Sequence, residues 1–532
     1  MPAEKWMEIT LDQLTQAINR LSPYKAPGSD GITNIVFQHC HQLANYLLPV
    51  FNAAVKLQIH YEPWKESITV ILCKPGKPNY SAPKAYHPIA LLNTMAKLLS
   101  VIMADRTVYI LETHNLLLAT HFGGHPGHTT EDSLHLLEST VCNTWRQGKV
   151  ASALFLDIEG AFPNAIMDRL LHNMKCRQLP PEIVQYTKQL LLGRKTRLRF
   201  DDYSSEWFDI TNGIGQGDPL SMILYIIYSS DLVDIAKKSK GELVLAFVNN
   251  TVLIAVAKTF QETHMILHSM LERRGGVYNW SSKHNSKFEM SKFGLIDFTL
   301  NRSKEHPPIV IHRITIKPSK SHKFLGVMVD QELHWKEHAS YALAKGVAYV
   351  ALIRRISTSA HRVPPRLMHQ LYRSIAVTKM LYAASVWLKP VFTADSQSLT
   401  RGSQGIVKKL VQVQRATAIT ITGVMRTSPT DSTEIHANLM PMSTLVQKML
   451  FNLSIHIASL PESHLLHKLA SRVKKHNVVH HKMALHHLLH GLKLKLGTID
   501  HHPMSYPAKL TDTFYHRYHC LEGRRLLRLP TV

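Results

Sequence analysis

Short apolar runs alternate with longer amphipathic stretches along the chain, which predicts a mixed fold of strands and helices. A Thr-x-x-Gln capping box at Thr10 predicts the start of a first helix, and the Pro- and Gly-rich segment Ser22–Gly31 predicts its end. The apolar run Ser67–Leu72 predicts a strand that leads into a basic hairpin at Lys74–Lys77. The run Ala151–Asp157 is apolar and short, as a buried strand is.

Polar segments between apolar arms predict two hairpins in the middle of the chain. The first turns at Asp201–Ser205, and the second turns at the polar pair Asn249–Asn250. A helix is then expected at about Lys258–Gly275, followed by an extended segment at Phe293–Phe298. The apolar run Phe324–Val329 predicts one further strand.

The last part of the chain reads as mostly helical. Pro365–Trp387 is predicted as one helix with Pro just inside its start. Its apolar residues Leu367, Leu371 and Ile375 are spaced four apart, which predicts one apolar face. Past about Ser398 the sequence remains helical in character and becomes basic and rich in His.

Composition limits the classes of protein that this chain can represent. It has 532 residues, of which 45% are hydrophobic and 19% charged, so it is neither a disordered nor a fibrous protein. Its five Cys are far apart without a C-x-x-C pair, which excludes a Cys-rich zinc module and favours a reducing compartment. We expect an intracellular protein without membrane association, because no apolar run approaches the length of a bilayer span and no targeting signal is visible.

The net charge of +24 favours a polyanionic partner. Half of this excess lies in the last quarter of the chain, which contains 18 Lys and Arg against 6 Asp and Glu from Arg401 onward. A carboxylate at the end of a buried strand, facing an acidic hairpin turn, is how two-metal phosphoryl-transfer enzymes hold their ions. Asp157 fits the strand half of that pattern, although a strand-end Asp alone is more often a cap.

Eight motifs follow one another along the chain, and one of them is Phe155-Leu-Asp-Ile-Glu-Gly-Ala-Phe162. The full series is Lys25–Ile32, Tyr86–Thr94, Phe122–Asp132, Phe155–Phe162, Asn212–Ser221, Ala246–Thr251, Trp280–Phe288 and Phe324–Val327. Taken in this order, the motifs resemble the reverse transcriptases of non-LTR (LINE-type) retrotransposons, particularly those of fungi.

This resemblance implies an α+β right-hand polymerase with fingers, a ferredoxin-like palm and a thumb. Residues 1–150 would form the fingers region, 151–335 the palm with interleaved fingers elements and the primer-grip strand, and 336–397 the thumb. Residues 398–532 would form a basic, His-rich helical C-terminal region. The family acts on an RNA template and a DNA primer, uses Mg²⁺, and works in the nucleus.

The family also implies roles for single residues near the strand end. Asp157 matches the first metal-binding aspartate, and Ile158 would offer its backbone carbonyl to the same ion. Phe162 matches the aromatic residue that excludes a 2′-hydroxyl and so selects deoxynucleotides. Gln216 and Gly217 match the loop that lies under the nascent base pair and template.

Two further groups have a structural explanation beside the functional one. Lys74 and Lys77 lie where basic fingers residues of the family meet template or triphosphate, but a solvated hairpin also explains them. Phe324, Leu325 and Gly326 match the primer-gripping strand, and a core strand is the alternative.

The palm hairpin departs from the family, which has two aspartates where this chain has Asn249 and Asn250. A neutral amide is a poor Mg²⁺ ligand, so we predict a crippled polymerase with Asp157 as its remaining catalytic carboxylate. An active RNA-directed DNA polymerase that tolerates the Asn pair is one alternative. A non-catalytic nucleic-acid-binding protein is the other.

Further departures concern histidine. The family usually has Arg where this chain has His87, His125 and His128, and both kinds of change can arise from a G-to-A transition. We therefore expect a piece of a decayed element whose 34 His lie mainly on the surface. Zinc binding by His486 and His490 is not favoured, because no Cys or matching carboxylate accompanies them.

Overall fold

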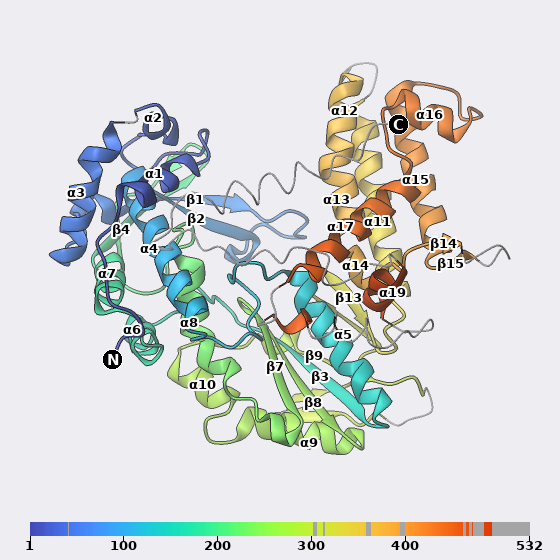
Figure 1. Ribbon diagram of the computed structural model, residues 1–532, viewed down its shortest axis with the longest axis horizontal. Helices are drawn as coiled ribbons and strands as arrows, with labels where there is room; N and C mark the ends of the chain where they lie inside the picture. The colour runs from blue at the N-terminus through green and yellow to red at the C-terminus, as the bar shows by residue number, and fades with distance from the viewer. Residues whose placement is uncertain are drawn as a thin grey trace.

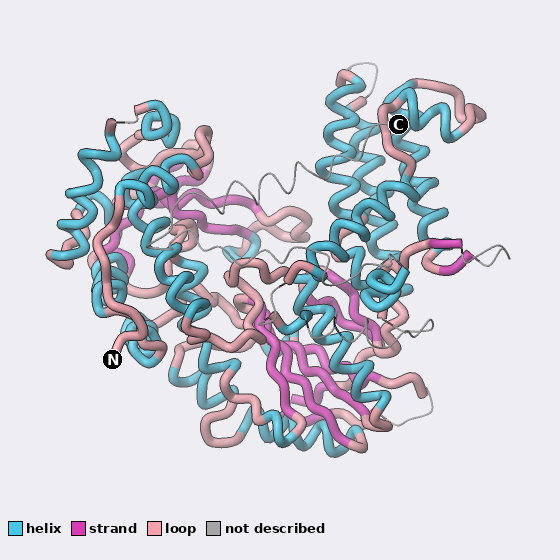
Figure 2. Tube along the Cα trace, viewed as in Figure 1, coloured by secondary structure: helices cyan, strands magenta, loops and turns pink. Residues whose placement is uncertain are grey.

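The computed structural model describes residues 1–40, 42–301, 306–311, 314–357, 363–393, 400–460, 464–467, 471 and 483–491. The two largest sheets lie apart from each other, with helices around both of them (Figure 2), and three two-stranded sheets complete the described strands. A bundle of helices from the C-terminal half forms the third part, on the right in Figure 1. None of the described helices has the length and apolar character that crossing a bilayer requires.

The central sheet has four antiparallel strands in the order β7-β8-β3-β9. Its strands are β7 (Glu242–Phe247), β8 (Asn250–Ala257), β3 (Val150–Asp157) and β9 (Gly294–Phe298). Helix α8 (Ser221–Val233) lies between β3 and β7 in sequence, and α9 (Phe260–Glu272) lies between β8 and β9. This βαββαβ order, with the first strand between the third and the fourth, is the ferredoxin-like topology expected of a polymerase palm.

Strand β3 is apolar throughout because both of its faces are covered. Leu154 and Leu156 point into the core shared with α8 and α9. Ala153 and Phe155 point to the other core, which includes residues of α5 (Thr130–Arg146). The prediction of a buried strand at Ala151–Asp157 is therefore confirmed.

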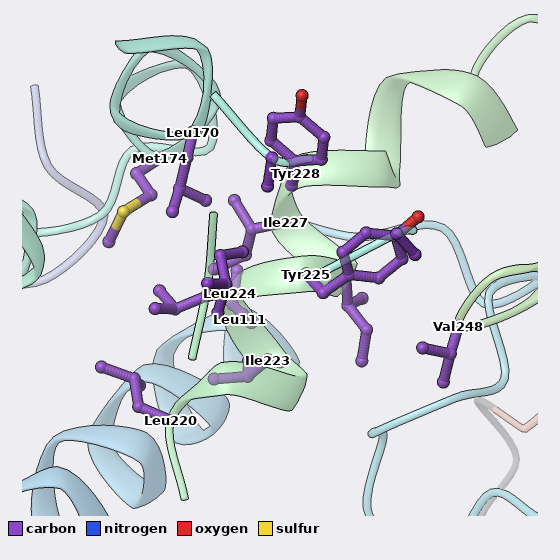
Figure 3. Close-up of a cluster of buried hydrophobic side chains, with 14 of the residues drawn as sticks. Leu111, Leu170, Met174, Leu220, Ile223, Leu224, Tyr225, Ile227, Tyr228 and Val248 are labelled. Carbon is purple, nitrogen blue, oxygen red and sulfur yellow. The ribbon is translucent and has the colours of Figure 1, made fainter. Parts of the chain in front are cut away.

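Helix α8 is enclosed almost all round, and its sequence is accordingly apolar rather than amphipathic. Figure 3 shows Leu224 and Ile227 of α8, and Leu220 at its N-cap, against side chains of neighbouring helices. Tyr225 and Tyr228 are also fully buried. This helix fixes the central sheet to the N-terminal elements.

The second sheet contains β1 (Glu66–Cys73), which pairs antiparallel with β2 (Tyr86–Leu92) and parallel with β4 (Arg194–Phe200). The short strands β5 (Tyr203–Ser204) and β6 (Phe208–Ile210) both pair with β4. The hairpin predicted around Asp201–Ser205 is thus present, although its tight turn is at Asp201-Asp202 alone. The surrounding helices are α1 (Leu11–Asn19), α2 (Asn34–His39), α3 (Leu43–Lys56), α4 (Thr94–Thr113), α6 (Met167–Cys176) and α7 (Pro181–Leu191).

The C-terminal helices share one hydrophobic core with one face of the central sheet. They are α11 (Lys336–Ile356), α12 (Pro365–Leu371), α13 (Thr378–Met380), α14 (Ala384–Trp387), α15 (Gln404–Thr422), α16 (Thr430–His436), α17 (Met442–Ala458) and α19 (Ala484–Gly491). Helix α11 packs against α15, and α17 packs against both α15 and α14. The prediction of a mostly helical region past Ser398 is confirmed for the described residues.

The predicted helix Pro365–Trp387 is wrong in its continuity and in its buried face. A π-helical segment at Tyr372–Val377 shifts the register, and the chain breaks before α14 at Ala383, where φ is +53°. Leu367 is 48% exposed and Ile375 is 37% exposed. The buried face instead carries Met368, Tyr372, Ala376 and Met380.

One strand prediction and one turn prediction also need correction. The run Phe324–Val329 is a hairpin of β12 (Ser321–Phe324) and β13 (Val327–Asp330), because Leu325 and Gly326 both take positive φ. In the palm hairpin the turn residues are Val248 and Asn249, because Asn250 already pairs with Phe247 in the ladder.

Candidate active site

The candidate site lies where β3 ends beside the β7–β8 turn. Asp157 is the last residue of β3 and lies opposite Asn250, the first residue of β8. Val248 takes a φ of +57°, an unusual conformation for a β-branched residue, and its buried side chain packs against the backbone of Gly123. Backbone strain of this kind occurs at sites where the surrounding structure fixes a turn for function.

The three residues that the sequence singled out are in direct contact. Asn249 donates from Nδ2 to Oδ1 of Asp157 at 3.2 Å, and Asn250 donates from Nδ2 to Oδ1 of Asn249 at 3.2 Å. The Asn249 carbonyl accepts the backbone N–H of Ile158 at 3.2 Å. The hairpin and the strand end therefore form one hydrogen-bonded unit.

A lysine that sequence reasoning missed holds the other oxygen of Asp157. Lys292 Nζ lies 2.8 Å from Asp157 Oδ2 and 2.5 Å from Glu289 Oε2. Partial burial acts against the charged form of Lys292, but the hydrogen bonds to Asp157 and Glu289 raise its pKa overall. The ammonium group is thus shared between two carboxylates and stays charged at neutral pH.

Glu289 is held to the strand end by its backbone as well. Its N–H donates to the carbonyl of Asp157 at 3.0 Å. The hydrogen bond from Lys292 is the main cause of the lowered pKa of Glu289, with smaller contributions from the charges of Lys84 and Lys77. Lys84 in turn pairs with Glu159 at 2.7 Å, so cations of the β1–β2 loop approach the site.

The predicted sugar-selecting residue lies beside this unit. Phe162 is half-buried and stacks on Tyr225 with ring centroids 4.9 Å apart. Burial is the main cause of the raised pKa of the Tyr225 phenol. The negative charge of the nearby Asp157 carboxylate contributes to the same shift. The carbonyl of Phe162 accepts the N–H of Ile214 at 2.8 Å, which joins it to the loop that carries Gln216.

Gln216 and Gly217 contact the second sheet rather than Asp157. The Gln216 carbonyl accepts the N–H of Ala90 in β2 at 2.7 Å. A Cβ on Gly217, where φ is +128°, would lie 2.3 Å from the Ala90 carbonyl oxygen. Only a residue without a side chain fits this approach, so the loop is fixed between the two sheets.

The two lysines of the β1–β2 loop differ in their contacts. Lys74 is half-buried, and its Nζ donates to the carbonyl of Lys84 at 2.9 Å. Lys77 is exposed, and its backbone N–H donates to the hydroxyl of Tyr80 at 3.3 Å. The side chain of Lys77 is the freer of the two to meet a ligand.

The predicted primer-grip residues form the β12–β13 turn. Phe324 is buried against Phe155, with ring centroids 5.3 Å apart, so its ring belongs to the core. Leu325 and Gly326 make the turn itself, and the hydroxyl of Tyr382 donates to the Leu325 carbonyl at 3.0 Å.

The expectation of surface histidines is wrong for many positions. His87 is exposed, whereas His125 is buried and pairs with Glu112, and His128 packs against His464 with centroids 4.4 Å apart. A neutral imidazole is compact enough to pack in a core, and burial is the main cause of the lowered pKa of His128 and His464. The buried histidines are His60, His121, His125, His135, His264, His284, His338, His464 and His486.

Divalent metal chemistry needs several anionic oxygens at one point. Among the described residues, no group of three or more His, Cys, Asp or Glu side chains is arranged to hold a metal ion. The two oxygens of Asp157 already face an amide N–H and an ammonium group. The residues present therefore do not fit the pair of Mg²⁺ ions that two-metal catalysis requires.

Comparison with known proteins shows which sequences this chain is similar to. Residues 74–329 match the family described as "Reverse transcriptase (RNA-dependent DNA polymerase)". The chain is 28% identical over 416 residues to the "Probable RNA-directed DNA polymerase from transposon X-element" of Drosophila melanogaster, covering 77% of this chain and 44% of that protein. It is 23% identical over 384 residues to the "RNA-directed DNA polymerase from mobile element jockey" of Drosophila funebris, covering 71% and 41%.

A solved structure, apo telomerase from Candida tropicalis truncated from its C-terminal domain, aligns with a TM-score of 0.34 at 12% identity, over 55% of this chain and 59% of that chain. The matched region spans less than half the length of the curated relatives. The predicted resemblance to non-LTR reverse transcriptases is confirmed, whereas a fungal affinity stays a prediction.

Proposed function

This chain carries a reverse transcriptase domain of the non-LTR retrotransposon type, and we propose that it binds template and primer but no longer copies them. The ligands are an RNA template and a DNA primer. The reaction of its heritage is RNA-templated DNA synthesis. The net charge of +24 supports a nucleic-acid partner, since Lys and Arg neutralise phosphates.

One observation carries the proposal of lost activity, namely the surroundings of the Asp157 carboxylate. Its oxygens contact the Asn249 amide and the Lys292 ammonium, at 3.2 Å and 2.8 Å. An amide adds no negative charge, and an ammonium group neutralises the carboxylate that remains. If the missing charges cost ~4 kcal/mol of transition-state stabilisation, the rate falls about 10³-fold.

We assign the parts of the hand as the sequence suggests. Residues 1–150 are the fingers region, 151–335 the palm with interleaved fingers elements, 336–397 the thumb and 398–532 the basic C-terminal region. The βαββαβ order of the central sheet supports the palm assignment. Nuclear action is proposed from the family alone.

A working polymerase is the second candidate, and one specific observation favours it. Glu289 lies on the same ammonium group as Asp157, so displacement of Lys292 would leave two carboxylates together. Mg²⁺ accepts Glu as readily as Asp. If the chain is a working polymerase that uses Glu289 as a metal ligand, Glu289→Gln would abolish primer extension. If the chain is inactive, the same substitution would leave primer extension absent, as before.

The proposal is tested by metal binding without any reaction. We expect the unmodified chain to bind Mn²⁺ or Tb³⁺ no more tightly than an Asp157→Ala variant does, as measured by Mn²⁺ electron paramagnetic resonance or Tb³⁺ luminescence. A variant with Asn249→Asp and Asn250→Asp is expected to bind at least about tenfold more tightly, because carboxylates replace amides beside Asp157. Asp157-dependent binding by the unmodified chain would contradict the proposal.

A further inference from the structure

Helix α3 is apolar on its outer face as well as on its inner face. The inner face carries the residues that are buried in the core, which are Ala44, Leu47, Phe51 and Val55. The outer face carries a second apolar set, which we call the α3 stripe and which consists of Tyr46, Val50, Ala53 and, at the C-cap, Leu57. Steps of four, three and four residues place this set on one side of a helix with 3.6 residues per turn.

The α3 stripe is presented to solvent in the single chain. Tyr46 is 72% exposed, Val50 is 50% exposed and Leu57 is 63% exposed. Ile59, which is 56% exposed, lies beside the last turn, because its N–H donates to the carbonyl of Ala54 at 2.9 Å. A helix that is apolar all round is normally buried. The stripe therefore calls for a partner that covers it.

The charge of the chain bears on what this partner is. Residues 43–55 contain no charged side chain, although the chain as a whole has a net charge of +24. Two copies of so basic a chain repel each other, so they meet most easily where the surface carries no charge. The α3 stripe meets that condition.

The spacing of the stripe makes it complementary to itself. When two copies of α3 pack antiparallel about a twofold axis between positions 51 and 52, Val50 of one copy faces Ala53 of the other. Tyr46 then faces Leu57, so each larger side chain meets a smaller one. The two copies of Lys56, which is the charged residue of this helix, are then about 14 Å apart along the axis at 1.5 Å per residue. This exceeds the Debye length of about 8 Å at physiological salt, so their repulsion is screened.

The apolar area is also sufficient for two proteins to associate. A whole aromatic side chain covers about 150–250 Å² and an aliphatic one less, so Tyr46, Val50, Leu57 and Ile59 together offer on the order of 400 Å². A standard interface buries about 800 Å² on each partner, of which a little over half, or roughly 450 Å², is apolar. The α3 stripe with a polar rim thus matches the lower range of stable interfaces.

We propose that the α3 stripe binds the same stripe of a second copy of this chain, as a twofold antiparallel helix pair, and that the protein forms a concentration-dependent dimer. Figure 1 shows α3 at the left edge of the molecule, whereas β3 and β7 of the central sheet lie well away from it. A second copy on α3 therefore leaves the candidate active site of each chain open.

The test is the oligomeric state of the full chain, measured by sedimentation velocity over a range of concentrations. Nuclease treatment and salt of about 0.5 M remove dimers that are bridged by nucleic acid. We expect a monomer–dimer equilibrium with a Kd on the order of micromolar, as is usual for an interface of this size. Val50→Glu and Ala53→Lys each place a charge at the centre of the contact, and each should raise Kd at least about tenfold.

Mixing the two variants tests the register of the helix pair. Val50→Glu and Ala53→Lys chains in equal amounts should form a dimer again, because Glu of one chain faces Lys of the other across the twofold axis. Met265→Glu adds the same charge on α9, at a side chain that is 65% exposed, and should leave Kd unchanged. Circular dichroism checks that all three variants keep the fold, as exposed positions allow.

Three results would overturn the inference. The unmodified chain could stay monomeric throughout the concentration range, which would leave the α3 stripe to a different partner. The dimer could persist unchanged in Val50→Glu, which would place the interface elsewhere. Both single variants could lose the dimer without recovery in the mixture, which would contradict the antiparallel pairing.

Discussion

Replacing Gly217 by alanine should release the loop that contains Gln216 and Gly217 from the second sheet, whereas the same change at Gly215 should not. The added Cβ at Gly217 would lie 2.3 Å from the Ala90 carbonyl oxygen, and φ there is +128°. At Gly215 the nearest atom is Arg194 Nη1, at 3.6 Å, which is ordinary contact. The two positions lie in one loop and differ in this approach and in backbone conformation, since φ is positive at Gly217 alone of the two.

The size of the effect follows from these distances. An unfavourable backbone conformation costs roughly 1–3 kcal/mol, and a clash with main-chain atoms costs a similar amount. We therefore expect Gly217→Ala to weaken the contact with β2 by about 2–6 kcal/mol. Gly215→Ala should stay within about 1 kcal/mol of zero, because fewer unfolded conformations offset small repacking costs.

Hydrogen exchange reports this contact directly, because the Ala90 N–H donates to the Gln216 carbonyl at 2.7 Å. A loss of 2 kcal/mol in local stability speeds exchange of that amide roughly 30-fold. Faster exchange over residues 86–92 in Gly217→Ala, with no change in Gly215→Ala, is the expected result. Equal protection in both variants would refute the reasoning, since it would show that the close approach does not hold the loop.

Three other predictions follow from charges. Burial lowers the pKa of His60 and His338 to about 4 in the folded protein. The unfolded chain therefore binds more protons than the folded protein between about pH 6.5 and 4. Each of the two residues should thus lower the free energy of unfolding by about 2 kcal/mol when the pH falls from 7 to 5. Urea unfolding at both pH values should show this loss, and His60→Phe should reduce it, whereas an unchanged pH dependence would contradict it. Lys292→Gln removes the ammonium group that Asp157 and Glu289 share. The two carboxylates are then free to bind a cation, so the affinity for Tb³⁺ should rise several-fold. An unaltered affinity would argue against the shared ion pair. Affinity for duplex RNA or DNA should fall with salt at a log–log slope near −0.9 for each phosphate contacted, so salt-independent binding would exclude a phosphate interface.

Local rules predicted much of the fold because the local sequence decides it. The Thr10 capping box and the buried strand at Ala151–Asp157 depend on near neighbours in sequence, and both are present. The motifs also brought Asp157 and Asn249 together correctly, because a hairpin beside a strand end fixes their register. These parts needed no knowledge of distant contacts.

The missed parts depend on contacts between distant segments. Lys292 and Asp157 are 135 residues apart and meet because the chain before β9 runs beside the end of β3. The sequence feature that could have indicated this contact is the Glu-x-x-Lys pair Glu289 and Lys292, just before a strand. It cannot be told from an ordinary solvent-exposed ion pair in the sequence. Periodicity also cannot say which apolar face a partner covers, and Leu367, on the predicted apolar face, is in fact exposed.

The central claim is that the Asn pair has removed polymerase activity from an otherwise intact palm, and primer extension on an RNA template tests it most directly. With Mg²⁺ or Mn²⁺, the unmodified chain should extend little or no primer, and Asn249→Asp with Asn250→Asp should restore extension that Asp157→Ala abolishes. Asn249→Asp alone should recover more than Asn250→Asp alone, because Asn249 is the residue in direct contact with Asp157. Full Mg²⁺-dependent extension by the unmodified chain, lost on Asp157→Ala, would contradict the claim and show that the two amides are tolerated.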